Sequence, residues 1–158
     1  AMCWGFECGD GWFDLVDTLC ANIQHHVNSA RDRHQMMAEK RKAYEAARGG
    51  DWELFDKFYK LFPKDSPFIL EERSKAADGY LPDVPEAVPQ VVATQIKEKF
   101  GGLCFYYYGG DDEVHGMVRM AESLSYKICE DCGKPGKPNT DGWISTQCED
   151  CRSKLCTP

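Results

Sequence analysis

The chain has 158 residues, of which 42% are apolar, 28% charged and 12% aromatic, a composition typical of a globular protein with a buried core. Nineteen Lys and Arg residues against 26 Asp and Glu residues give a formal net charge of −7, which disfavours a general nucleic-acid binder that neutralises phosphates. No apolar run is long enough to cross a bilayer and no signal peptide is recognisable, so we expect a cytoplasmic protein without a membrane partner.

A long helix is predicted first, starting near Gly11 with Asp10 as its N-cap. Apolar residues recur along it at helical spacing: Trp12, Leu15, Val16, Leu19, Ile23 and Val27. The pattern continues more weakly to Gly49-Gly50. Such a length without a break is unusual, so we expect a bend near Asn28-Ser29.

Two shorter helices are expected to follow. The first runs from an Asp51 cap to Pro63, and the second begins with Ser66 as its cap and ends by Gly79. Three prolines then indicate an extended connection and a boundary: Pro82, Pro85 and Pro89. We therefore assign residues 2–89 to a helical region.

β-strands are predicted after this boundary, because the apolar period changes there to the alternation typical of strands. We expect a β-hairpin that turns at Gly101-Gly102. A helix over residues 91–100 that ends at the glycines is the rival interpretation. Asp111 or Asp112 then caps a further helix that leads into the C-terminal cysteines. Residues 90–127 thus form a region of one hairpin and one helix.

Four of the nine cysteines form two CxxC pairs separated by fifteen residues: Cys129, Cys132, Cys148 and Cys151. An odd number of cysteines, without a secretion signal, favours metal ligation over disulfides. Four thiolates complete a tetrahedron with no open position, which predicts one structural Zn²⁺ per chain. A catalytic zinc and a redox-active CxxC are less favoured alternatives. Residues 128–158 are expected to form a zinc-ribbon or treble-clef-like tail whose folding depends on the metal.

These regions together predict an α+β fold, with N-terminal helices, a β-hairpin or small antiparallel sheet and a zinc tail in one compact unit. A second metal site is a less favoured alternative, with ligands drawn from Cys3, Cys8, His25, His26 and Cys156. No sequence motif of a hydrolase, a phosphate-binding loop or a metalloprotease is present. We interpret Cys20 as a buried small hydrophobic residue and His26 as a partly buried helix residue, in preference to a Cys or His nucleophile at this place. We expect no enzymatic activity.

A ligand-binding face on the hairpin is a further hypothesis. Alternation places three polar residues on one face of the first strand: Gln95, Lys97 and Lys99. Tyr106 or Tyr108 of the second strand can lie beside them. Cations next to exposed aromatic rings can hold a phosphate and stack a base. We favour the simpler interpretation, in which the lysines discourage edge pairing and the tyrosines complete the core.

Three segments carry a resemblance to known proteins. They are residues 6–15, which contain Gly11-Trp12-Phe13, residues 95–106, which read QIKEKFGGLCFY, and residues 129–136, which read CEDCGKPG. In these segments the chain resembles a family of small uncharacterised proteins encoded by phages and bacteria. The resemblance does not extend to residues 31–89. It implies no activity, but it does imply a phage or prophage setting, in which small non-enzymatic proteins act on host machinery.

Three classes of function follow from these observations. The favoured class is a protein-binding module in the cytoplasm of the bacterial host, which acts stoichiometrically on a host defence protein or another bacterial protein. The second class is a protein that sequesters a small or cyclic nucleotide used as a defence signal. The third is a nucleic-acid-binding zinc protein, for which the net charge is unfavourable and duplex binding is disfavoured. A homo-oligomer is compatible with each class.

Overall fold

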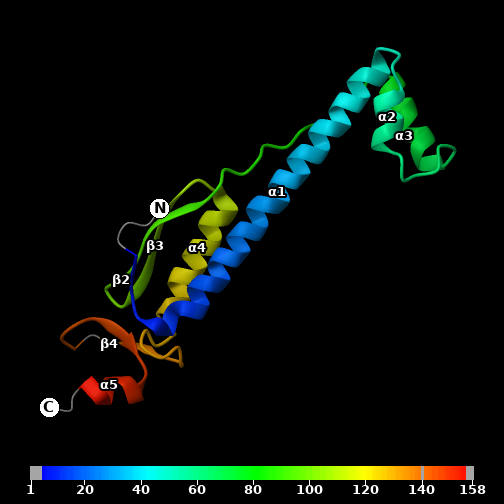
Figure 1. The fold of residues 1–158 in the computed structure, drawn as a ribbon. Coiled ribbons are helices and arrows are strands. Elements are labelled where there is room, and N and C mark those ends of the chain that lie inside the picture. The colour runs from blue at the N-terminus through cyan, green and yellow to red at the C-terminus, as the bar shows by residue number, and fades with distance from the viewer. Residues whose placement is uncertain (1–4, 140, 156–158) are drawn as a thin grey trace. The chain divides into compact units, whose positions relative to one another are not determined.

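The computed structural model describes residues 5–139 and 141–155 and shows an α+β fold (Figure 1). The chain divides into two compact units, Ala1–Asn28 with Val88–Pro158 and Ser29–Ala87. The sequence analysis expected one compact unit made of regions 2–89, 90–127 and 128–158, so the observed division differs from the expected one. The reason is that the start of the first long helix shares a core with the hairpin and the helix that follows the hairpin.

Helix α1 (Phe13–Arg48) contributes residues to both units and is preceded by a 3-10 turn, η1 (Asp10–Trp12). It continues without interruption through Asn28 and Ser29, where the sequence analysis expected a bend. Between Ala30 and Arg48 the chain contains no Gly or Pro and many strong helix formers, which explains the continuity. The helix ends where Gly50 adopts a φ of 91°, a conformation that favours glycine.

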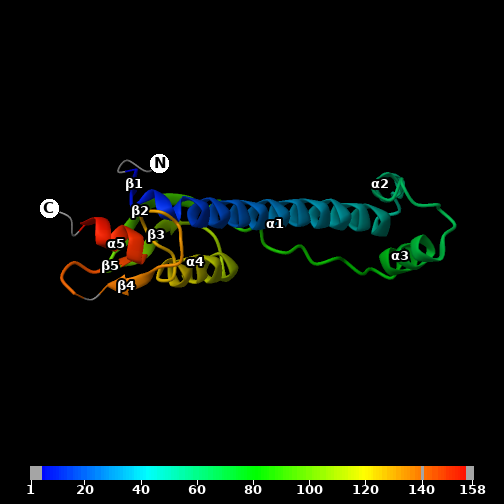
Figure 2. The same ribbon diagram turned by 90° about the horizontal axis from the view of Figure 1, so that it is seen from below.

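The first unit is built around a three-stranded mixed sheet with the order β1-β2-β3. β1 (Phe6–Glu7) pairs in parallel with β2 (Val92–Lys99), and β2 pairs antiparallel with β3 (Gly102–Tyr108). Helix α4 (Asp112–Ser125) lies alongside the first part of α1 (Figures 1 and 2). Side chains from these elements form one buried core: Trp12, Val16, Leu19, Ile23, Val27, Ile96, Leu103, Phe105, Val114, Val118 and Ala121.

The predicted hairpin is confirmed, and the rival helix over residues 91–100 is wrong. The turn is formed by Phe100 and Gly101, with φ angles of 52° and 79°, rather than by Gly101-Gly102. Two positive φ angles are the signature of a two-residue turn whose twist matches the strands. Gly102 is needed for another reason, because a Cβ atom there would lie 2.3 Å from the Tyr126 ring.

Helix α4 protects the outer edge of β3. The backbone N–H of Leu103 donates to Ser125 Oγ at 2.8 Å, and that of Phe105 donates to Glu122 Oε1 at 3.0 Å. These bonds satisfy backbone donors that have no neighbouring strand. Asp111, one of the two predicted caps, is the N-cap of this helix, because its Oδ1 atom accepts from the Val114 N–H at 3.0 Å.

The second unit packs the later part of α1 with α2 (Glu53–Phe58) and α3 (Pro67–Ala77). Its buried core residues are Ala43, Tyr44, Ala47, Phe55, Tyr59, Ile69 and Ala76. Helix α2 is shorter than the predicted 51–63, because after Phe58 the chain continues in turns, with the Phe62 N–H donating to the Tyr59 carbonyl at 2.9 Å. Ser66 caps α3 as predicted, with its Oγ atom accepting from the Ile69 N–H at 3.4 Å.

A buried carboxylate, Glu72, lies inside the second unit with 5% of its surface exposed. Its oxygens accept bonds from Tyr44 at 2.5 Å, Tyr59 at 2.7 Å, Lys40 at 2.7 Å and Lys75 at 3.0 Å. Burial alone would raise the pKa of Glu72, but these donors outweigh burial and lower the pKa to about 2. Glu72 is therefore ionised in the folded protein.

Candidate metal centre

The C-terminal segment contains a knuckle, a short hairpin and a helix. Cys129 and Cys132 lie on the knuckle that follows α4, and β4 (Lys137–Asn139) then pairs antiparallel with β5 (Ser145–Gln147). Cys148 directly precedes α5 (Glu149–Leu155), and Cys151 lies in the first turn of that helix. The second cysteine pair thus lies at the start of a helix, which is compatible with the predicted zinc-ribbon or treble-clef-like tail.

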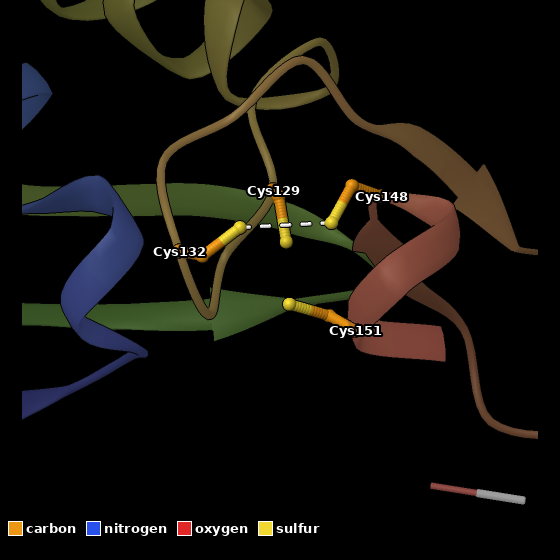
Figure 3. Close-up of side chains that lie close together, drawn as sticks. All are labelled: Cys129, Cys132, Cys148 and Cys151. Atoms are coloured by element: carbon orange, nitrogen blue, oxygen red, sulfur yellow. Dashed lines mark hydrogen bonds between the residues drawn. The ribbon is translucent and has the colours of Figure 1, made fainter. Parts of the chain in front are cut away.

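The four sulfur atoms converge on one point (Figure 3). All four lie within 4.8 Å of one another, and the Sγ atoms of Cys132 and Cys148 are 3.6 Å apart. A tetrahedral ion with metal–sulfur bonds of about 2.3 Å would place its sulfurs about 3.8 Å apart. A disulfide would require about 2.05 Å. The structure therefore brings all four predicted ligands together in a cluster that can hold one metal ion.

Backbone hydrogen bonds and glycines shape the knuckle. The Gly133 N–H donates to the Cys129 carbonyl at 2.9 Å, and the Cys129 N–H donates to the Lys134 carbonyl at 2.7 Å. Gly133 has a φ of 74°, and a Cβ atom on Gly136 would lie 2.8 Å from the Cys129 nitrogen. The CxxCGxPG sequence thus specifies a turn that directs both sulfurs to one side.

The thiols of the cluster ionise unequally. Burial opposes ionisation of Cys129, but the N–H groups of Cys148, Cys132 and Asp131 outweigh burial and lower its pKa to about 7. The neighbouring sulfurs of Cys132 and Cys148 raise the pKa of Cys151. Four adjacent thiols cannot all become thiolates unless a cation offsets their repulsion. The donor set is therefore suited to a thiophilic metal ion.

Two basic side chains lie around the cluster. The Nε and Nη2 atoms of Arg152 are buried and have no hydrogen-bond partner among the described residues. Arg152 lines a cavity of about 330 Å³ together with Cys148, which directly precedes α5. Asp150 raises the pKa of Lys134, and so do the sulfurs of Cys132 and Cys148. Because a divalent ion with four thiolates carries a net charge of about −2, the Lys134 ammonium fits a fully ionised centre.

The start of α1 is fixed to the knuckle. The Gly11 N–H donates to the Glu130 carbonyl at 2.7 Å, and Trp12 Nε1 donates to the Ile128 carbonyl at 2.9 Å. A Cβ atom on Gly11 would lie 2.2 Å from the Cys129 carbonyl oxygen, so no side chain fits there. The sequence analysis missed this contact, although a short Gly-Asp-Gly-Trp sequence before a helix could have suggested it.

The hairpin tip is attached to the other half of the cluster. Thr146 Oγ1 donates to the Gly101 carbonyl at 2.6 Å, and the Thr146 carbonyl accepts from the Glu130 N–H at 2.9 Å. Thr146 has no exposed surface. The metal cluster is therefore part of the first unit rather than an independent tail.

The register of the hairpin determines the positions of the predicted ligand-binding residues. Gln95 pairs with Tyr106, Lys97 pairs with Cys104, and Lys99 pairs with Gly102, so these residues share one sheet face. The Lys97 Nζ atom lies 5.2 Å from the centroid of the Tyr106 ring. Alternation along β3 places Tyr108 on this face as well, and 71% of its surface is exposed.

Other contacts on this hairpin face are less favourable for an anion. Gln95 donates to Glu7 Oε2 at 2.8 Å, and Glu7 pairs with Lys97 in the parallel ladder. The Lys99 Nζ atom lies 5.6 Å from the Phe100 ring, next to the turn. The Glu7 carboxylate therefore lies beside Lys97 on the predicted site, where it offsets part of the positive charge of Lys97 and Lys99.

The alternative second metal site is only partly covered by the structure. Cys3 and Cys156 lie outside the described residues. Among the described residues, Cys8, His25 and His26 belong to no cluster of three ligands. His26 instead contacts Asp111 at 2.9 Å and Glu113 at 3.2 Å, which joins α1 to the start of α4. Cys20 is exposed, so its interpretation as a buried residue is wrong. Partial desolvation of the Cys20 thiol and the nearby Asp17 carboxylate raise its pKa, which does not favour a nucleophile there.

Comparisons with known proteins gave no match to a family model, a curated protein or a solved structure. The resemblance to phage and bacterial proteins therefore rests on the three sequence segments alone. No described helix has the length and apolar character needed to cross a membrane. Function is accordingly inferred from the chain's own residues.

Proposed function

We propose that this protein is a zinc-stabilised, non-enzymatic binding protein that acts stoichiometrically on a partner protein. The observation that carries the proposal is a pair of exposed phenylalanine rings on the second unit, Phe62 and Phe68, with the exposed Leu61 next to Phe62 in the sequence. These three residues are here named the Leu61 patch. Leu61 is 87% exposed, Phe62 51% and Phe68 47%, and the two phenylalanine rings are 5.3 Å apart. Neighbouring exposed aromatic and aliphatic side chains are typical of protein-interaction surfaces.

The chemistry of the metal centre supports the non-enzymatic part of the proposal. Zn²⁺ suits four thiolates, and Cys129, Cys132, Cys148 and Cys151 would hold it with no coordination position left for water or substrate. The ion would supply a cross-link between the knuckle and α5. The chain's own contribution is to pack that cross-link against the start of α1 and the hairpin tip.

The target follows from the resemblance to phage and bacterial proteins. We propose a host protein, with a defence protein as the favoured class, located in the bacterial cytoplasm. A small or cyclic nucleotide bound by Gln95, Lys97, Lys99, Tyr106 and Tyr108 is the second candidate, supported by the contact between Lys97 and Tyr106. Changing Lys97 and Lys99 to Ala should abolish nucleotide binding if this candidate is correct, and full retained affinity would exclude it.

Site-specific cross-linking tests the proposed function. A photo-reactive amino acid at Leu61 should capture one host protein at a 1:1 ratio, whereas the same group at the exposed Ser123 of the first unit should not. The double change Phe62→Ser and Phe68→Ser should abolish capture, because the partner loses apolar contact area. Capture that is equal from both positions, or that persists in the double variant, would contradict the assignment.

A further inference from the structure

We propose that a groove between α1 and α2 in the second unit binds a short acidic amphipathic helix of the partner protein. The groove, here named the lysine groove, has a volume of about 500 Å³. Its lining residues are Glu39, Lys42, Ala43, Leu54, Lys57, Phe58 and Lys60. The inference rests on the proposed function and adds a second contact with the same partner, separate from the Leu61 patch, together with its chemistry.

The floor of the lysine groove is apolar. Ala43 is buried, Phe58 is half-buried and Leu54 is 46% exposed, so an incoming apolar side chain would remove part of this surface from water. The floor is formed by two helices, α1 and α2, that are both in the second unit. An amphipathic helix that places its apolar stripe in such a groove is a recurring mode of peptide recognition.

The rim of the groove is positive because the lysines of the second unit that form no ion pair among the described residues gather there. The second unit contains six lysines, and three of them are neutralised within the unit: Lys40 by Glu72, Lys64 by Asp56, and Lys75 by Glu71 and Glu72. The other three, Lys42, Lys57 and Lys60, are exposed and form no ion pair among the described residues. All three line this one groove.

The acidic residue of the lining, Glu39, forms no ion pair with the three lysines among the described residues. The Glu39 Oε1 atom accepts a hydrogen bond from Gln35 at 3.2 Å, one turn earlier on α1. The groove therefore presents three ammonium groups and one carboxylate around an apolar floor, which is an excess of positive charge. The complementary ligand carries carboxylates beside apolar side chains, so that each lysine gains a partner as the floor is covered.

The charge of the whole second unit favours a peptide over a nucleic acid. Residues 29–87 contain eleven Lys and Arg against twelve Asp and Glu, so the unit has no net positive charge that would attract a phosphate backbone. Three lysines around an apolar floor suit side-chain carboxylates at helical spacing. A nucleic acid would leave the apolar floor without a matching surface.

Fluorescence anisotropy with a labelled peptide tests the inference. The probe is a helical peptide of about 16 residues with Leu at alternate third and fourth positions and Glu elsewhere. It should bind the full-length protein, and the triple change Lys42→Glu, Lys57→Glu and Lys60→Glu should weaken binding at least about tenfold. A peptide with Lys in place of Glu should not bind the wild type. Added salt should weaken binding of the Glu peptide to the wild-type protein, because salt screens the attraction between the glutamates and the lysines.

The matched control is the double change Lys97→Glu and Lys99→Glu on the hairpin, which should leave peptide binding unchanged. Circular dichroism confirms that each variant folds. Equal binding of the Glu and Lys peptides, or full affinity of the Glu peptide for the triple variant, would overturn the inference. It would also be overturned by a DNA or RNA oligonucleotide that competes with the Glu peptide at equal affinity. If the peptide fails but cross-linking from Leu61 persists, the lysine groove is wrong and the proposed function stands.

Discussion

The Nε1 atom of Trp12 donates a hydrogen bond to the carbonyl oxygen of Ile128 at 2.9 Å, across 116 positions of sequence. Ile128 directly precedes the first cysteine of the metal centre, and Trp12 has no exposed surface. One side chain therefore belongs both to the apolar core and to the support of the metal ligands. We therefore expect folding of the first unit and metal binding to be coupled through this contact.

Trp12→Phe should test the coupling, because it keeps an aromatic ring in the core but leaves the Ile128 carbonyl without its donor. We expect a loss of unfolding free energy of about 1–3 kcal/mol in urea denaturation. The neighbouring Phe13→Leu is a matched control, since Phe13 is 68% exposed and should change stability by less than about 0.5 kcal/mol. Equal stability of the two variants would show that the hydrogen bond contributes nothing.

Cys132→Ser should remove one metal ligand and destabilise more than the C-terminal segment. Because Gly11 and Gly101 both contact this segment, metal loss should also loosen the start of α1 and the hairpin tip. Hydrogen exchange should therefore rise in both regions. Cys20→Ser is the control, since Cys20 is exposed on α1. Exchange that rises only after residue 128 would contradict the coupling.

Arg152→Met should weaken zinc binding by about 10–100-fold, as expected for a charged group that supports a metal centre without ligating it. The buried guanidinium nitrogens lack a partner among the described residues, so in the metal-free protein the change should cost little or no stability. Competition with a chromophoric chelator measures the affinity. Lys127→Met, at an exposed position, is the control. Unchanged zinc affinity in the Arg152 variant would rule out its role.

Acid should destabilise the second unit through Glu72. The pKa of Glu72 is lowered from 4.5 to about 2 in the folded protein, so its contribution is fully present above pH 4.5 and is lost as the pH falls toward 2. The shift corresponds to roughly 3 kcal/mol. Glu72→Gln should remove most of this pH dependence, and it should also destabilise the protein at pH 7 because Lys40 loses its partner.

Urea unfolding at pH 7 and pH 3 distinguishes Glu72 from an ordinary surface acid. Glu71 is the matched control, because its side chain is 66% exposed and also contacts Lys75. Glu71→Gln should keep the acid sensitivity of the wild type. Identical pH profiles for the Glu72 and Glu71 variants would mean that the buried network does not determine acid stability.

Local sequence signals predicted much of the fold. The Asp111 and Ser66 caps, the hairpin strands and the four clustered cysteines each depend on residues close together in sequence, and the structure agrees with each. Long-range contacts explain most of the differences. Gly101-Gly102 suggested the turn, but the contact with Tyr126 accounts for Gly102 and Phe100 takes the other turn position.

The division of α1 between two separate cores could not be predicted from the apolar pattern of the helix itself. Its apolar residues before Asn28 pack with β2, β3 and α4, whereas Ala43, Tyr44 and Ala47 pack with α2 and α3. A helical periodicity shows that a face is buried but not what covers it. The contacts of Gly9 and Gly11 with Glu130 and Cys129 were missed for the same reason.

Native mass spectrometry of the freshly purified, reduced protein tests the central claim of a zinc-stabilised fold most directly. The account predicts one zinc ion per chain, bound by Cys129, Cys132, Cys148 and Cys151, and its loss with unfolding of the first unit when a chelator removes it. A folded chain with no stoichiometric zinc, and with the same stability in the presence and absence of chelator, would contradict it.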